Sequence, residues 1–197
     1  MDSTCVGSGR ENGASGTAVE ITARIAAITV RMLSAADARA AVPELTDVLL
    51  DCVAGGASVS FMASLDRATA EGFWRNVALE VEQGSRILLV AEDGEGVLGT
   101  VQLVVAQPPN QPHRADLSKM LVHRRARRRG VGAALMKAAE DAARAAGKTL
   151  LVLDTASPDA ERLYARAGWV KVGVIPNYAL WPQGGFCDTT YFYKALE

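Results

Sequence analysis

Residues 120–135 read MLVHRRARRRGVGAAL, and this stretch decides the fold. The segment ADLSKMLV (115–122) predicts a strand, and the alanine-rich run from Gly132 to Ala146 predicts a helix. A basic loop joins the two. A helix that begins there presents unpaired backbone N–H groups and the positive end of its dipole, which suits an anion. Glycines let a ligand approach the backbone closely, and arginines offer charge-assisted donors to phosphate oxygens. The stretch therefore predicts a pyrophosphate site.

The basic loop matches neither of two common nucleotide-binding motifs, and it has a further interpretation as a charged surface patch. The phosphate patterns GxxxxGK[ST] and GxGxxG are absent from the chain. A solvated arginine cluster, or an RNA-binding or localisation patch, remains the alternative, since His123–Arg129 holds five arginines and one histidine. RNA recognition favours aromatic side chains among the charges, and residues 113–148 contain no Phe, Tyr or Trp. We therefore expect no nucleic acid partner.

Two segments carry a family resemblance. The pattern RxxGxG/A after a strand (Arg127, Gly130, Gly132, Ala133) resembles the coenzyme A-binding motif of the GNAT acetyltransferase superfamily. The segment Ser157–Trp169 resembles the family's second cofactor segment, N-x-x-A-x-x-L-Y-x-x-x-G-F, with Ser in place of Asn and Trp in place of Phe. The resemblance covers about residues 27 to 196. It implies the α/β GNAT fold, a mixed central sheet flanked by helices, in an N-acetyltransferase that uses acetyl-CoA. The implied cofactor contacts are Met120, Leu121, Val122, Arg127, Arg128, Arg129, Gly130, Val131, Gly132, Ala133, Ser157 and Tyr164.

A narrower resemblance bears on the acceptor. The stretches Gly55–Asp66, Leu117–Gly132, Leu151–Thr155 and Val172–Leu180 look like a subgroup of tabtoxin-resistance acetyltransferases. That subgroup acetylates the free amine of a small β-lactam amino acid toxin. The implied acceptor is therefore the primary amine of a small toxin or antibiotic of the tabtoxinine-β-lactam type. A protein N-terminus or lysine is the competing acceptor. A non-catalytic protein of the same fold that binds coenzyme A or nucleic acid is the alternative from another class.

Acetyl transfer to an amine needs a neutral amine, a donor to the oxyanion and a proton for the departing thiolate. We expect the Leu121 N–H to face the oxyanion, because two strands splay near that point in this fold. Tyr164 is the expected acid, since the family's tyrosine at this place lies near the coenzyme A sulfur; a core tyrosine is the alternative. Asp116 and Asp154 are the expected bases or ammonium ligands. Their alternatives are a strand charge and a turn aspartate.

The acceptor site is expected between two loops, Gly55–Leu65 and Tyr178–Phe186, which flank the opening in this family. Besides the two aspartates, its expected walls are Phe61, Met62, Tyr178 and Trp181. Ordinary core or dimer packing is the alternative for these four residues, and a homodimer is one assembly that the sequence leaves open.

Periodicity predicts the rest of the chain. Residues 1–22 are expected to form a flexible tail and residues 23–197 a single domain. The other expected strands are 25–32, 86–92, 97–105, 149–153, 169–174 and 189–194; the other expected helices are 34–53, 66–83 and 157–167, with a loop at 176–188.

Composition excludes several classes of protein. The formal net charge is −1, so no global basic field attracts nucleic acid. Three separated cysteines and two histidines offer neither a disulfide framework nor a metal site. No apolar run approaches the ~20 residues that span a bilayer. Met1–Thr17 has no basic and apolar signal-peptide pattern, so a cytoplasmic location is the default expectation.

Overall fold

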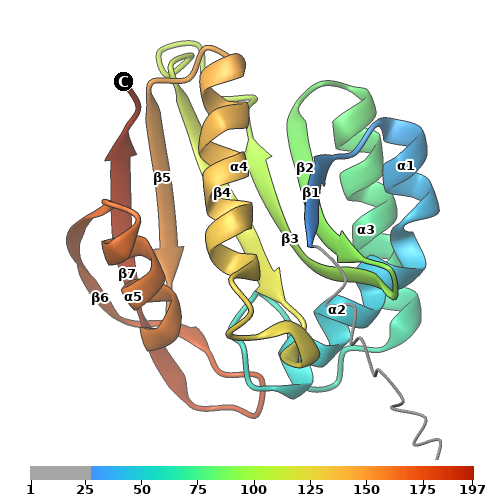
Figure 1. Ribbon diagram of the computed structural model, residues 1–197. Helices are drawn as coiled ribbons and strands as arrows, with labels where there is room; N and C mark the ends of the chain where they lie inside the picture. The colour runs from blue at the N-terminus through green and yellow to red at the C-terminus, as the bar shows by residue number, and fades with distance from the viewer. Residues whose placement is uncertain (1–27) are drawn as a thin grey trace, which may run out of the picture.

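The computed structural model describes residues 28–197, so the expected tail and the start of the first expected strand lie outside the described residues. Seven strands form one sheet in the order β1-β2-β3-β4-β5-β7-β6 (Figure 1). Only β4 and β5 run parallel among the described neighbours. The strands are β1 Thr29–Met32, β2 Arg86–Asp93, β3 Gly96–Val104, β4 Arg114–Val122, β5 Leu150–Thr155, β6 Val170–Leu180 and β7 Phe186–Ala195.

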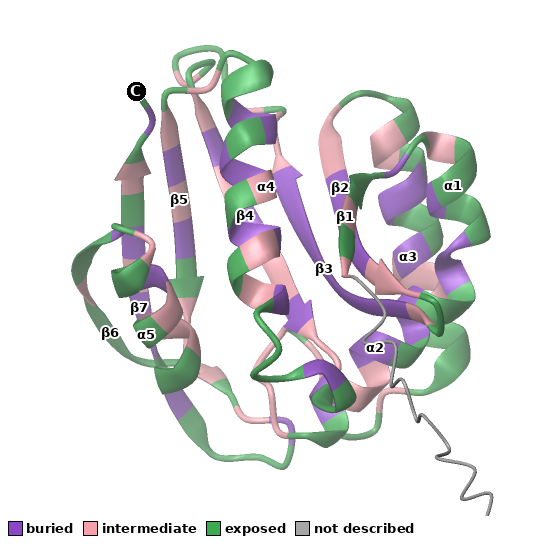
Figure 2. Ribbon diagram, viewed as in Figure 1, coloured by how far each residue is buried: buried purple, intermediate pink, exposed green. Residues whose placement is uncertain are grey.

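Helices cover both faces of the sheet, and each side has its own apolar core (Figure 2). On one side lie α4 (Val131–Ala145) and α5 (Pro158–Arg166); on the other lie α1 (Ala35–Ala40), α2 (Val42–Ala54) and α3 (Arg67–Glu82). A short 3-10 helix, η1, spans Arg124–Ala126. The expected mixed α/β architecture is confirmed.

Two expected elements differ from the structure. The helix expected over 34–53 is two helices, because Pro43 in the first turn of α2 cannot continue a helix from α1. The strand expected at 169–174 begins close to its expected start, but β6 continues to Leu180 through the segment expected to be a loop. Pro176 is tolerated there since β6 is an edge strand, and Asn177 adopts a φ of +53° where the pairing with β7 shifts.

The parallel pair β4 and β5 separates after a short ladder. Pairing is limited to Arg114–Asp116 with Leu150–Val152. Beyond it the strands diverge toward their carboxyl ends (Figure 1). On its other side, β4 shifts register against β3 between Thr100 and Gln102, and Lys119 has a φ of +50° in this bulge. A bulge bends and twists its strand, which helps to turn β4 away from β5.

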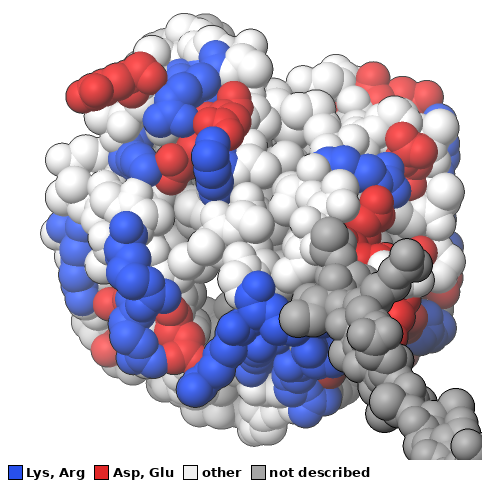
Figure 3. Space-filling view, viewed as in Figure 1, with Lys and Arg blue, Asp and Glu red and all other residues white. Residues whose placement is uncertain are grey.

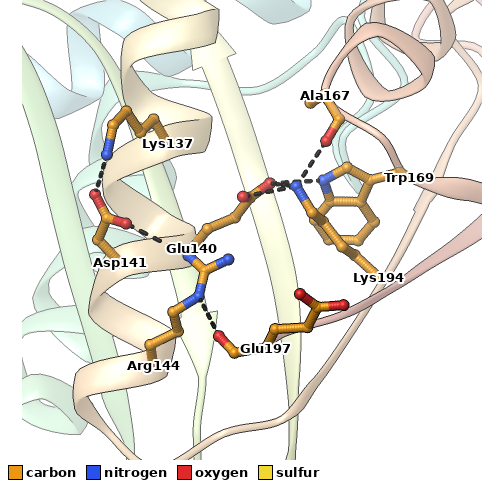
Figure 4. A network of polar contacts seen from close by, with 8 residues as sticks. All are labelled: Lys137, Glu140, Asp141, Arg144, Ala167, Trp169, Lys194 and Glu197. Atoms are coloured by element: carbon orange, nitrogen blue, oxygen red, sulfur yellow. Dashed lines mark hydrogen bonds and ion pairs between the residues drawn. The ribbon is translucent and has the colours of Figure 1, made fainter.

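A half-buried ion pair ties α4 to β7 and to the turn after α5 (Figure 4). The Lys194 ammonium donates to both carboxylate oxygens of Glu140 at 2.7 Å and to the Ala167 carbonyl at 2.6 Å. The Trp169 indole N–H donates to the same carboxylate at 3.1 Å. Trp169 in turn packs on Tyr164, with ring centroids 6.0 Å apart. The network therefore positions Tyr164 through its packing on Trp169.

Replacing Lys194 with Met should lower the free energy of unfolding by roughly 3 kcal/mol, because it leaves a largely buried carboxylate without its cation. Urea unfolding measures this quantity. The matched control is Lys137→Met, which removes an exposed lysine that pairs with Asp141 on the outside of α4. The control should leave the midpoint nearly unchanged. Equal losses in the two variants would show that the Lys194 pair has no special structural role.

Candidate active site

The first turn of α4 carries free backbone donors. Gly130 precedes the helix with a φ of +84°, a conformation that other residues rarely adopt, and no side chain caps the helix. The helical ladder starts with the Ala134 N–H, which donates to the Gly130 carbonyl at 3.0 Å. The N–H groups of Val131–Ala133 therefore have no acceptor within the helix, and they carry the positive end of its dipole.

The structure divides the arginines of the basic loop into two groups. Arg124, Arg125 and Arg129 each pair with a carboxylate, at 2.8, 3.1 and 3.3 Å. Arg127 and Arg128 have no carboxylate within 4.0 Å among the described residues. Figure 3 shows Lys and Arg atoms gathered over the loop that leads into α4. Arg127 lies near the Cys52 thiol, and neither guanidinium charge is neutralised by a described carboxylate, so both charges can act on an anion at the helix start.

Gly132 has a packing role that the sequence did not indicate. A Cβ at this position would lie 3.2 Å from the Leu163 side chain, so the glycine lets α5 approach α4. Between the two helices runs a groove of about 320 Å³, lined by Ala133, Met136, Lys137, Glu140, Leu163, Arg166 and Ala167. One end of the groove lies at Ala133, in the first turn of α4.

Backbone register decides which amides face the opening between β4 and β5. The His123 N–H donates to the Leu98 carbonyl on β3, and a Cβ on Gly99 would lie 2.6 Å from the Leu121 carbonyl oxygen. Both groups thus face β3, and the amides of a strand alternate between its two neighbours. The Leu121 N–H consequently points to β3, so the expectation that it faces the oxyanion is wrong. The N–H groups of Met120 and Val122 point to the opening.

Tyr164 lies in the core below the opening. Its side chain is 4% exposed and packs between Trp169 and Phe192, the latter at a centroid distance of 5.7 Å. Burial, with a smaller contribution from the Asp154 charge, raises the pKa of the Tyr164 phenol well above its usual value. The phenol is therefore protonated at any physiological pH, as a proton donor must be. Its hydroxyl forms no hydrogen bond with the residues that the structure describes.

Ser157 acts as the N-cap of α5. Its hydroxyl accepts a hydrogen bond from the Ala160 N–H at 3.4 Å. Its expected contact with the cofactor stays a prediction.

The structure brings the two expected carboxylates to one face of the sheet. Asp116 pairs with Val152, and Asp154 lies two residues further along β5. Because side chains alternate along strands, both carboxylates point away from α4 and α5. Asp116 is already occupied: it accepts from Gln107 at 3.1 Å and from Arg114 at 3.4 Å. Asp154 accepts only the Thr189 hydroxyl, at 2.8 Å, and has no cation within 4.0 Å among the described residues.

Sequence reasoning missed Tyr191. It faces Asp154 across the β5–β7 ladder, and its hydroxyl lies 2.9 Å from the Tyr178 hydroxyl. This hydrogen bond, with burial and the charges of Asp154 and Asp116, raises the pKa of Tyr191 to about 12. The alternation in TTYFYK (189–194) puts Tyr191 and Tyr193 on one face, but only the pairing with β5 shows which residues they meet.

The two expected acceptor loops meet. The Ala63 N–H donates to the Pro182 carbonyl at 2.9 Å, and the Ser58 hydroxyl donates to the Leu180 carbonyl at 3.2 Å. Of the four expected wall residues, Phe61 packs on Phe73 at 5.4 Å, Met62 is exposed, Trp181 is half-buried in the β6–β7 turn, and Tyr178 lies on β6 rather than in a loop. Their contact with an acceptor stays a prediction.

Residues 28–197 contain no cluster of three or more potential metal ligands. Cys52 is a buried thiol, and burial raises its pKa to about 11. None of the helices in this range is long and apolar enough to cross a membrane.

Comparisons with known proteins agree with this geometry. A family model described as "Acetyltransferase (GNAT) family" matches residues 55–169. An uncharacterized N-acetyltransferase in the hisH-hisA intergenic region of Azospirillum brasilense is 30% identical over 153 residues, which are 74% of this chain and 88% of that protein.

Two solved structures share the fold. An N-acetyltransferase from Staphylococcus aureus Mu50 has a TM-score of 0.72 at 15% identity and covers 87% of this chain and 99% of its own. The putative acetyltransferase yncA from Salmonella typhimurium, solved with its cofactor acetyl-CoA, has a TM-score of 0.71 at 19% identity. This match covers 87% of this chain and 95% of the yncA chain. The free amides of α4, the unpaired arginines and the open strand pair fit a diphosphate followed by a narrow thioester arm. The chain belongs to the acetyltransferase (GNAT) family and is an acetyl-CoA-dependent N-acetyltransferase.

Proposed function

We propose that this enzyme acetylates the primary amine of a small molecule, with amino-acid-like toxins or antibiotics of the tabtoxinine-β-lactam type as the acceptor class. The observation that carries the proposal is the unpaired Asp154 carboxylate, which lies beside Tyr191 at the opening between β4 and β5. An ammonium group is the natural partner of such a carboxylate.

The loop contacts favour a small acceptor over a polypeptide. The hydrogen bonds Ala63–Pro182 and Ser58–Leu180 join the 55–65 loop to the end of β6 and the turn that follows it. We infer that this junction narrows the route to the carboxylates. A peptide needs an open groove that an extended chain can cross. A small amine needs only an entrance.

The chain's own groups can be assigned to the steps of the reaction. Acetyl-CoA supplies an activated acetyl thioester when it is bound. The amides of Val131–Ala133, with Arg127 and Arg128, would hold its diphosphate. The Met120 N–H is the donor that we assign to the oxyanion. Tyr164 would supply the proton for the departing thiolate, and Asp154 would hold the amine and take up its proton directly or through water.

Placing a negative charge at Ala133 should weaken acetyl-CoA binding by at least about tenfold, because a carboxylate would compete with the diphosphate for the same free amides. Ala133 is exposed in the first turn of α4. The variant is Ala133→Glu, its neutral isostere Ala133→Gln is the control, and calorimetry measures the dissociation constant. Equal affinities of the two variants would remove the diphosphate from this position.

Tyr164→Phe should reduce kcat on the order of 100-fold while the KM for acetyl-CoA stays close to that of the parent enzyme. The buried ring is kept, so the packing on Trp169 is preserved. Tyr193→Phe, which removes an exposed hydroxyl from the same part of the sheet, is the control. An undiminished kcat in Tyr164→Phe would assign this residue to the core alone.

The proposed acceptor class is tested with a panel of small amines, toxin-like amino acids and peptides. Thiol release from acetyl-CoA, corrected for hydrolysis, should be faster with small amines than with peptides. Asp154→Asn should raise the KM for the amine by about tenfold or more, and Asp116→Asn should raise it less, because Asp116 already has donors from Gln107 and Arg114. A preference for peptides, or an unchanged KM in Asp154→Asn, would contradict the proposal.

A further inference from the structure

A lysine lies in the wall of the acceptor opening. Lys119 occupies the bulge of β4, next to Met120. Its ammonium donates to the Ser60 hydroxyl at 3.1 Å and lies 5.9 Å from the centre of the Phe73 ring. The side chain therefore reaches the place where the 55–65 loop meets α3, on the same side of the sheet as the two carboxylates.

The half-buried Lys119 ammonium has no oppositely charged partner among the described residues. No carboxylate lies within 4.0 Å of it among residues 28–197. Burial and the neighbouring Arg86 charge lower the pKa of Lys119, and the Asp154 charge acts in the opposite direction. An ammonium has three donors, and a single hydroxyl with one aromatic face compensates only part of its lost hydration.

The opposite charge is near but not paired with it. Asp154 is close enough for its charge to act on Lys119, yet the two groups form no ion pair. Arg86 cannot serve as a free cation in the same way, because it is held by Glu80 and Gln102. Among residues 28–197, Lys119 and Asp154 are thus a cation and an anion near the opening that have no ion-pair partner.

We propose that Lys119 binds a carboxylate or a similar anionic group of the acceptor, so that the enzyme selects amines that also carry an acid group. This inference rests on the proposed function, since it assigns the second charged group of the same small amine. An acceptor with its ammonium at Asp154 and its acid group at Lys119 would neutralise both unpaired charges of the opening. The enzyme would therefore bind it better than a simple amine, which can neutralise only one of them. Lys119 is a specificity-determining residue in this scheme; it takes no part in the proton transfers.

The test compares matched acceptors that differ only in the acid group. Suitable pairs are phenylalanine with phenethylamine, β-alanine with ethylamine, 4-aminobutyrate with propylamine and 6-aminohexanoate with pentylamine, with kcat/KM expressed for the neutral amine. The parent enzyme should prefer the acid-bearing member by at least about tenfold in one or more pairs, the discrimination expected of a charge-assisted contact. The spacing of the preferred pair reports the distance between the two subsites.

The variant Lys119→Met keeps an unbranched chain of similar length and should bring this ratio close to one. Lys119→Arg should keep a preference for the acid. Lys137→Met removes an equally long cation from the outer face of α4 and should leave the ratio as in the parent enzyme. Thermal unfolding of each variant establishes that it is folded.

The outcomes separate this inference from the proposed function. Efficient acetylation of the simple amines with no preference for their acid-bearing partners would overturn the role of Lys119 and leave small-amine acetylation standing. A preference that persists in Lys119→Met would do the same, because another group would then bind the acid. Transfer to peptides alone, with no small amine accepted, would overturn both.

Discussion

The separation of β4 from β5 is the constraint on which the rest of this molecule depends. Three residues of β4 pair with β5, and then the two backbones part. Where a buried strand stops pairing with its neighbour, its backbone N–H groups need another hydrogen-bond acceptor. Here the Met120 and Val122 amides are in that position, and the register with β3 shows that they cannot be satisfied on their other side. A thioester arm between the strands would complete the sheet.

Several features maintain this separation. The bulge at Lys119 turns the end of β4, and the basic loop leads directly from it into α4. From the other side, Leu163 of α5 lies against Gly132 of α4, and Tyr164 lies in the core under the gap. The Glu140–Lys194 pair joins α4 to β7, so the two halves of the sheet are connected through the helices as well as through the short ladder. Packing, rather than the strand pairing itself, positions the chemical groups.

Local chemistry made much of this predictable. A strand, a basic loop and a glycine-led helix could be recognised at 115–146, and the cofactor motif follows from the same residues. The pairing between strands that are far apart in the chain was harder to predict from the sequence. Leu121 was the expected oxyanion donor. The expectation failed because the bulge at Lys119, which sets the direction of every later amide in β4, has no clear sequence signature. Tyr191 was missed since its neighbour Asp154 is 37 positions earlier in the chain and only the antiparallel register joins them.

Side-chain partners were the least predictable features. Nothing in the run of arginines shows that Arg124, Arg125 and Arg129 are held by acids from α2 and the β2–β3 hairpin while Arg127 and Arg128 are not. Likewise Asp116 and Asp154 have the same chemistry in the sequence, but only Asp116 has an arginine beside it. Such differences depend on which distant residues fold next to each side chain.

The most direct measurement is a crystal structure of the enzyme with acetyl-CoA. The account predicts the diphosphate on the amides of Val131–Ala133 and the thioester carbonyl oxygen within about 3 Å of the Met120 nitrogen, the usual N–H···O distance. A cofactor bound elsewhere, or a thioester outside the space between β4 and β5, would contradict it.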